Sequence, residues 1–121
     1  MVRKTISAIY ITPVVSGAAQ DVIILNQPLD VDEYYEYPDE RRELTITCAD
    51  IQPKDYYRLI SEKFDTYLVC VDSIWENPDE GIEYHSPVTY IPYNCITINS
   101  SVSGQLDTNS DVINIQLNYK N

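Results

Sequence analysis

Short runs of β-branched residues that alternate with polar residues recur along this chain, and they constrain its fold more than any other feature. In Leu44–Cys48, three apolar side chains would face one side and two threonines the other. Cys95–Asn99 and Asp111–Tyr119 show the same period of two, which is typical of half-buried strands, and we expect them to form a hairpin. Ile and Val number 25 and Thr 8, against only 4 Ala. The composition therefore favours strands and argues against a helical bundle or a coiled coil.

Four further segments are expected to be strands. Residues 5–12 alternate with a register slip near Ala8 and end at Pro13, and residues 21–26 form an apolar run that we expect to be buried on both faces. Residues 66–71 are the most apolar, which predicts a central strand. Residues 82–93 contain two prolines, which indicate an edge strand or a bulge. Residues 14–20 are expected to be a flexible turn region, and Asn77–Gly81 carries a strong turn signal.

One helix is expected over residues 53–64. Proline is tolerated at the first helical position because its missing N–H would be unpaired there in any case. Apolar residues then recur at offsets 0, 3, 4 and 8, which places them on one stripe that would lie across a sheet. They are Tyr56, Leu59, Ile60 and Phe64.

These elements together predict a mainly β fold. Seven candidate strands, one short helix in a connection and a turn about every ten residues suggest an antiparallel β-sandwich. The length of 121 residues suits one domain, so we expect a single sandwich over residues 1–121.

The charge pattern argues against some classes of binding partner. The formal net charge is −11, and neither Lys nor Arg occurs from Thr5 to Glu40 or from Phe64 to Tyr119. Binding to a phosphate backbone requires several cations that displace counterions. We therefore expect no direct binding to nucleic acid or to an anionic membrane. The acidic surface either keeps the chain soluble or faces a partner.

The sequence also indicates a cellular setting. The first residues lack a long apolar region and a cleavage site, so we expect no secretory signal. Cys48, Cys70 and Cys95 are an odd number of cysteines without a C-x-x-C pair, which predicts buried thiols in a reducing compartment. We expect a cytoplasmic or virion-associated protein.

Signatures of catalysis and metal binding are missing from the sequence. His85 is the only histidine, and there is no nucleophile elbow, no H-E-x-x-H motif and no Gly-rich phosphate loop. EF-hand registers that begin at Asp30 or Asp107 lack the required Gly and Glu. We expect no enzymatic activity, no metal and no cofactor.

Tyrosine is the unusual component of this chain, with eleven residues against one Phe and one Trp. Residues 30–40 combine six acids with three tyrosines, and we expect them to form a surface loop. Three more tyrosines lie near the prolines of residues 82–93. Because tyrosine suits half-exposed recognition surfaces, these segments are the candidate protein-binding site. Its predicted residues are Asp32, Glu33, Tyr34, Tyr35, Glu36, Tyr37, Tyr84, Tyr90 and Tyr93.

The first functional hypothesis is a non-enzymatic protein interaction and assembly module that binds a protein partner or a second copy of itself. By analogy of fold, one setting is a decoration or connector subunit of a viral particle. The alternative is an acidic inhibitor that imitates nucleic-acid phosphates and blocks a nucleic-acid enzyme. A weaker alternative is a carbohydrate-binding module that uses Trp75 and nearby tyrosines as an aromatic platform.

Overall fold

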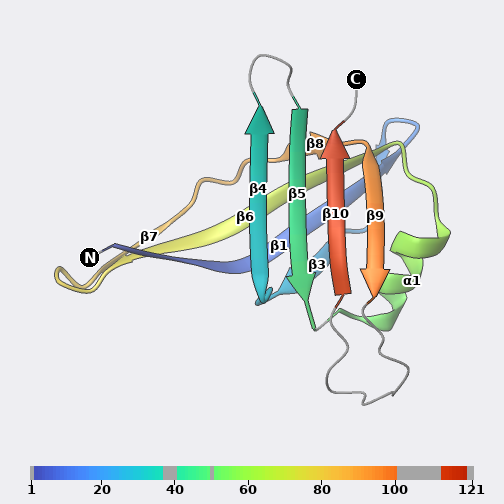
Figure 1. Cartoon of the computed structure of the whole chain (residues 1–121). Helices are drawn as coiled ribbons and strands as arrows, with labels where there is room; N and C mark the ends of the chain where they lie inside the picture. The colour runs from blue at the N-terminus through green and yellow to red at the C-terminus, as the bar shows by residue number, and fades with distance from the viewer. Residues whose placement is uncertain (1, 37–40, 50, 101–112, 120–121) are drawn as a thin grey trace, which may run out of the picture.

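The computed structural model describes residues 2–36, 41–49, 51–100 and 113–119, which form two antiparallel sheets and one short helix (Figure 1). The sheets lie face to face with apolar side chains between them. This arrangement confirms the predicted mainly β fold with a helix in one connection. The described part of the chain contains ten strands instead of seven, because one expected strand is split and two others were not predicted.

Two long strands, β1 (Arg3–Val15) and β6 (Thr66–Asn77), form the centre of the first sheet and pair along most of their length. Short strands border them on both sides. β2 (Ala18–Ala19) and β3 (Ile23–Asn26) pair with β1, whereas β7 (Ile82–His85) and β8 (Ile91–Tyr93) pair with β6. The prediction that residues 66–71 lie in a central strand is confirmed.

The expected end of the first strand at Pro13 is wrong. β1 continues to Val15 and turns into β2 through Ser16 and Gly17, whose φ values of 52° and 80° are typical of a type I′ hairpin. The Pro13 carbonyl accepts a hydrogen bond from the Gln20 N–H at 2.8 Å. In a strand the N–H and C=O of one residue point to the same edge. The N–H that Pro13 lacks would therefore point toward β2, and the β1–β6 ladder is not interrupted.

The second sheet has the order β4-β5-β10-β9. The predicted antiparallel pairing of the last two strands is confirmed. The bounds of the four strands are β4 (Asp30–Glu36), β5 (Arg41–Cys48), β9 (Cys95–Ser100) and β10 (Ile113–Tyr119).

The expectation of a surface loop over residues 30–40 is wrong for its first part, because Asp30–Glu36 is the edge strand β4. The acidic side chains do not prevent pairing, because their repulsion is offset by contacts to β5. The Leu29 N–H donates to the Thr47 carbonyl at 2.8 Å, and Glu36 lies opposite Arg41. Val31 packs against the core from the inner side of the strand.

The core lies between the two sheets and takes side chains from both. Its fully buried residues are Ile9, Ile11, Ile23, Leu25, Leu44, Ile46, Val69, Ile115 and Leu117. In β3, Ile23 and Leu25 are buried whereas Ile24 and Asn26 are exposed, so the expectation of burial on both faces is wrong. The outer face of the first sheet is open to solvent at this edge. Cys48 and Cys70 are buried, as predicted, whereas Cys95 is only partly buried.

Helix α1 (Pro53–Ser61) covers the open side of the sandwich beside β9 (Figure 1). Leu59 is buried, but Ile60 is 53% exposed and borders a hollow beside Ile96 and Ile98. Three residues of the expected stripe, Tyr56, Leu59 and Phe64, pack against the core, but the helix ends at Ser61 and not at residue 64. Phe64 lies in the extended segment that follows and packs edge-on against Tyr67, with ring centroids 5.7 Å apart.

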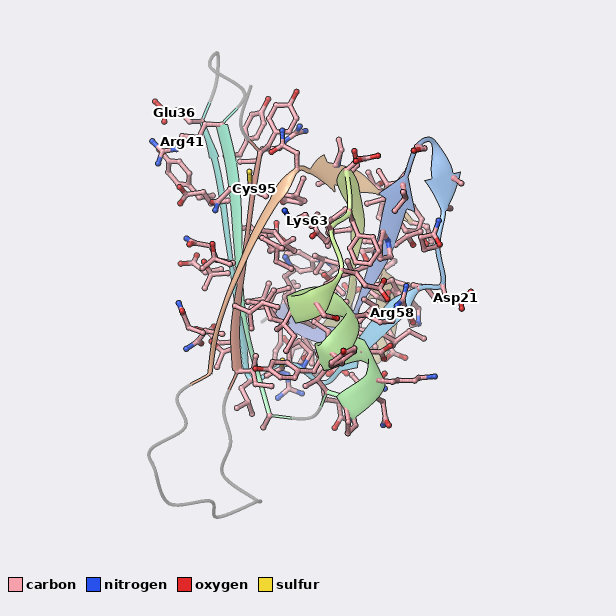
Figure 2. The ribbon with its side chains drawn as sticks, turned by 90° about the vertical axis from the view of Figure 1, so that its right-hand side faces the viewer. Asp21, Glu36, Arg41, Arg58, Lys63 and Cys95 are labelled. Carbon is pink, nitrogen blue, oxygen red and sulfur yellow. The ribbon has the colours of Figure 1, made fainter. Side chains whose placement is uncertain are left out.

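The other side of α1 is fixed to the first sheet by polar contacts. Asp55 is buried, and its carboxylate lies 3.8 Å from the Arg58 guanidinium. Arg58 also donates a hydrogen bond to the Asp21 carbonyl at 3.0 Å, and Figure 2 shows Arg58 reaching from the helix toward Asp21. The helix thus closes the gap between β3 and β9.

Candidate protein-binding surface

Three strand segments extend from the sandwich past the edge of the second sheet (Figure 1). They are Arg3–Ile6 of β1, Ile74–Asn77 of β6 and all of β7, and we call them the arm. The turn at its tip has the predicted Asn77–Gly81 sequence. The Gly81 N–H donates to the Asn77 carbonyl at 2.9 Å, and Gly81 has a φ of 68°, which suits glycine.

A β-bulge at Ser7 joins the arm to the body of the first sheet. Ile6 lies opposite Ser73, and Ala8 lies opposite Asp72, so Ser7 is the extra residue. The Ser7 hydroxyl shares its one proton between the Asp72 carboxylate at 2.9 Å and the Asp72 carbonyl at 3.1 Å. This bulge is the register slip that the sequence predicts near Ala8.

The register shows which side of the arm continues the core. On β6, Tyr67 and Val69 face the core, and alternation places Ser73 and Trp75 on the same side. Lys4 and Tyr84 lie directly opposite Trp75 on the two neighbouring strands. Ile82 lies opposite Asn77 on this side as well. We call Lys4, Trp75, Ile82 and Tyr84 the arm face.

The arm face is not covered by the second sheet. Trp75 is 41% exposed, Ile82 40% and Tyr84 57%. The Lys4 ammonium lies 5.3 Å from the centroid of the Trp75 ring, within the range of a cation–π contact. The sandwich therefore presents two large aromatic side chains on a side that faces the core elsewhere in the sheet.

Apart from Ile74, the opposite side of the arm is polar. Arg3 and Glu76 form an ion pair at 3.0 Å, and Glu83 lies opposite Glu76 on β7. His85 lies on the same side and is exposed. The two sides of the arm thus differ sharply in character, and only the arm face offers a contiguous apolar surface.

A groove of about 300 Å³ separates the base of the arm from β4. Lys4 and Ile6 line it from the arm, and Leu29, Asp30 and Val31 line it from the chain entering β4. Leu29 is exposed beside this groove. The groove therefore has residues of the arm on one side and the start of the acidic edge strand β4 on the other.

The predicted residues of β4 lie on both sides of that strand. The outer side of β4 carries Asp32, Tyr34 and Glu36, whereas the inner side carries Glu33 and Tyr35. Tyr34 and Tyr35 are both exposed. Tyr37 lies outside the described residues, as does the segment 107–111 considered for calcium.

Charged contacts organise the end of β4. The Tyr34 hydroxyl donates to the Glu36 carboxylate at 3.2 Å, and this hydrogen bond and the carboxylate charge raise the pKa of Tyr34. Arg41 forms an ion pair with Glu43 at 3.0 Å, which raises the pKa of Arg41. Figure 2 shows Glu36 and Arg41 close together at this end of the sheet. Arg41 on β5 thus lies next to the acidic residues at this end of β4.

Two of the predicted tyrosines lie away from β4 and the arm face. Tyr90 is half exposed and lies beside Tyr10 over the outer face of the first sheet. Tyr93 is only 5% exposed and belongs to the core, and burial raises its pKa. Its prediction as a surface contact is wrong, because β8 pairs with β6 and turns this ring between the sheets.

Sequence reasoning missed most of the arm face. The sequence predicts Tyr84 as a contact and Trp75 only as part of a sugar platform, and it gives no signal for Lys4 or Ile82. The alternation of β6 indicates which side chains share a side, but it carries no signal of where the opposite sheet ends. Within residues 2–36, 41–49, 51–100 and 113–119, no group of three His, Cys, Asp or Glu side chains is arranged to hold a metal ion.

Comparison with known proteins adds no relative: no family model, no curated protein and no solved structure matches this chain. No helix in the described part of the chain is long and apolar enough to cross a membrane.

Proposed function

We propose that this protein is a non-enzymatic interaction module that acts as an assembly or accessory subunit and binds another protein through the arm face. The observation that carries the proposal is the exposure of Trp75 and Tyr84 side by side, on the side of the sheet that faces the core elsewhere. Aromatic anchors of this kind commonly supply most of the energy of a protein interface.

The charge of the chain indicates the chemistry of the partner. The arm face and Leu29 would contact apolar side chains, and the neighbouring β4 edge carries Asp30, Asp32 and Glu33. A partner whose apolar patch is bordered by basic residues complements both parts. A second copy of this chain fits less well, because each copy carries a formal charge of −11.

To test this proposal, proteins that bind this chain are captured from the organism that encodes it. The affinity of the purified partner for the chain is then measured. The double variant Trp75→Ala/Tyr84→Ala should weaken binding at least about 30-fold, because each ring is expected to act as a hot spot. Tyr57→Ala is the matched control, since Tyr57 is an exposed tyrosine on α1. A partner that binds the double variant as tightly as the wild type contradicts the proposal.

The nucleic-acid mimic remains a separate hypothesis with a different surface. It predicts that replacing Asp32, Glu33 and Glu36 by Asn or Gln abolishes binding and that affinity falls steeply with salt. Arm-face binding predicts that these changes mainly slow association, because rim charges act on the rate of encounter. The two variants and a salt series on one complex therefore distinguish the hypotheses.

The paired aromatic rings also keep the carbohydrate alternative open to test. Two adjacent exposed rings form a platform on which a sugar could stack. However, the Lys4 ammonium lies over the Trp75 ring. Binding of a glycan that is lost in Trp75→Ala would favour the carbohydrate function over the protein interface.

A further inference from the structure

A hollow on the outer face of the first sheet is independent of the arm face. It has a volume of about 290 Å³, and segment 86–90 borders it as it crosses from β7 to β8. Both strands pair with the same edge of β6, so this segment passes beside Cys70 and Asp72. The lining residues are Tyr10, Cys70, Asp72, Ser86, Pro87, Val88 and Tyr90.

The position of the hollow is fixed by hydrogen bonds on both sides. Ser86 is held to β6, because its N–H donates to the Ser73 carbonyl and its hydroxyl accepts from the Ser73 N–H, both at 2.9 Å. The Asp72 carboxylate accepts a hydrogen bond from Ser7 at 2.9 Å. Pro87 restricts the backbone of the crossing segment. Ser86 and Asp72 are therefore held in place by the fold.

The lining combines two tyrosine rings with one carboxylate and includes no basic side chain. A neutral apolar ligand would cover the carboxylate without compensating its charge, which is unfavourable. A bare metal ion would need several oxygen ligands, and only Asp72 supplies a carboxylate. An organic ammonium group meets both needs, because it is attracted to aromatic faces and to the carboxylate.

From this lining we infer that the hollow between Asp72, Tyr10 and Tyr90 is a binding site for an organic ammonium group, either of a small molecule or of a lysine side chain. The volume lies at the lower end of the range for ligand pockets, so it suits a head group and not a large ligand. Val88 is 78% exposed at the rim, which leaves the site open on that side. The inference goes beyond the proposed interface and does not depend on it.

A titration followed by NMR tests the site, with choline as the probe and 3,3-dimethylbutan-1-ol as its neutral isostere. Choline should shift the resonances of residues 70–72 and 86–90 in a saturable way. It should bind about 2- to 30-fold more tightly than the neutral alcohol, the range expected between an exposed and a desolvated cation–π contact. The absence of saturable shifts at these residues, or equal affinity for both compounds, overturns the inference.

Variants identify the groups responsible. Asp72→Asn keeps an acceptor for Ser7 but removes the charge, and it should weaken choline binding about 5-fold or more. Asp32→Asn makes the same change of charge on β4 and should leave the affinity unchanged. Tyr90→Leu should also weaken binding, and because Tyr90 is half exposed this variant tests the site even where Asp72→Asn fails to fold. Choline affinity that is unchanged in both lining variants overturns the inference.

A second pair of ligands shows whether the ammonium group belongs to a small molecule or to a lysine side chain. Blocked lysine and its Nε-trimethylated form are titrated in the same way. Binding of either one to residues 86–90 supports a side chain of a partner protein as the ligand. Binding of choline alone supports a small molecule.

Discussion

The two halves of β6 present the same side of one strand to different surroundings. In the first half, Tyr67 and Val69 point between the sheets and are buried. In the second half, Trp75 lies on the same side but is 41% exposed, because the strand continues past the second sheet. The comparison shows that alternation assigns a side of a strand, whereas burial depends on what lies opposite.

The largest expected difference in stability is between variants of Ile11, a buried core residue, and variants of Trp75. Ile11 lies opposite Val69 and is fully buried, so Ile11→Ala should lower the free energy of unfolding by about 2 to 5 kcal/mol. Trp75→Ala should lower it by about 1 kcal/mol or less, through loss of the contact with Lys4. Urea unfolding measures both. Similar losses would mean that the arm face is packed in solution.

The helix allows the same comparison on a smaller scale. Leu59→Ala should cost about 2 to 3 kcal/mol because Leu59 is buried, whereas Ile60→Ala should cost about 1 kcal/mol or less. Thermal and urea unfolding of the two variants test this difference between neighbouring residues. A larger loss for Ile60→Ala would contradict the orientation of α1 against β9.

Tyrosine ionisation distinguishes buried rings from exposed ones. Burial raises the pKa of Tyr67 and Tyr93 above the ordinary value of 10.0. The unfolded chain then loses these protons first, so the free energy of unfolding should fall as the pH rises above about 10. The ultraviolet absorbance of phenolate should show Tyr67 and Tyr93 ionising only above the ordinary value of 10.0. Tyr93→Phe should reduce the loss of stability above that pH.

The raised pKa of Tyr34 has a different cause, which a second variant separates. Its largest contribution is the hydrogen bond to the Glu36 carboxylate. Glu36→Gln should therefore lower the pKa of Tyr34 toward its ordinary value and leave the ionisation of Tyr67 and Tyr93 unchanged. An unchanged Tyr34 titration in this variant would contradict the contact.

The smallest expected effect lies on the polar side of the arm. The Arg3–Glu76 ion pair has side chains that are 70% and 38% exposed, so solvent screens it. Arg3→Ala should change the free energy of unfolding by less than about 0.5 kcal/mol, and added salt should reduce even this difference. A loss above about 1 kcal/mol would show that the pair holds the arm in place.

The sequence predicts much of the fold, because most strands have a clear period of two. Leu44, Ile46 and Cys48 are buried as expected, and the slip near Ala8 is a true bulge. The missed strand β4 shows where this reasoning fails. Repulsion among its acids alone favours a loop, whereas pairing with the next strand, β5, places Arg41 and Arg42 opposite Glu36 and Tyr35.

The candidate surface was less predictable than the fold for a related reason. Exposure of Trp75 depends on where the second sheet ends, and burial of Tyr93 depends on the pairing of a three-residue strand with β6. Neither is encoded in the local sequence. The composition correctly indicated that some of the tyrosines near the prolines are exposed, but it could not separate Tyr84 from Tyr93.

The bulge at Ser7 sets the direction of the whole arm, so a small change in its bend moves the tip of the arm. Bulges bend a strand and increase its twist, and the arm extends about 13 Å beyond this point at roughly 3.3 Å per residue from Ser73 to Asn77. A change of about 10° in the bend would therefore displace the tip by about 2 Å. The direction in which Trp75 and Tyr84 point therefore depends on the bend at Ser7, which lies outside the arm.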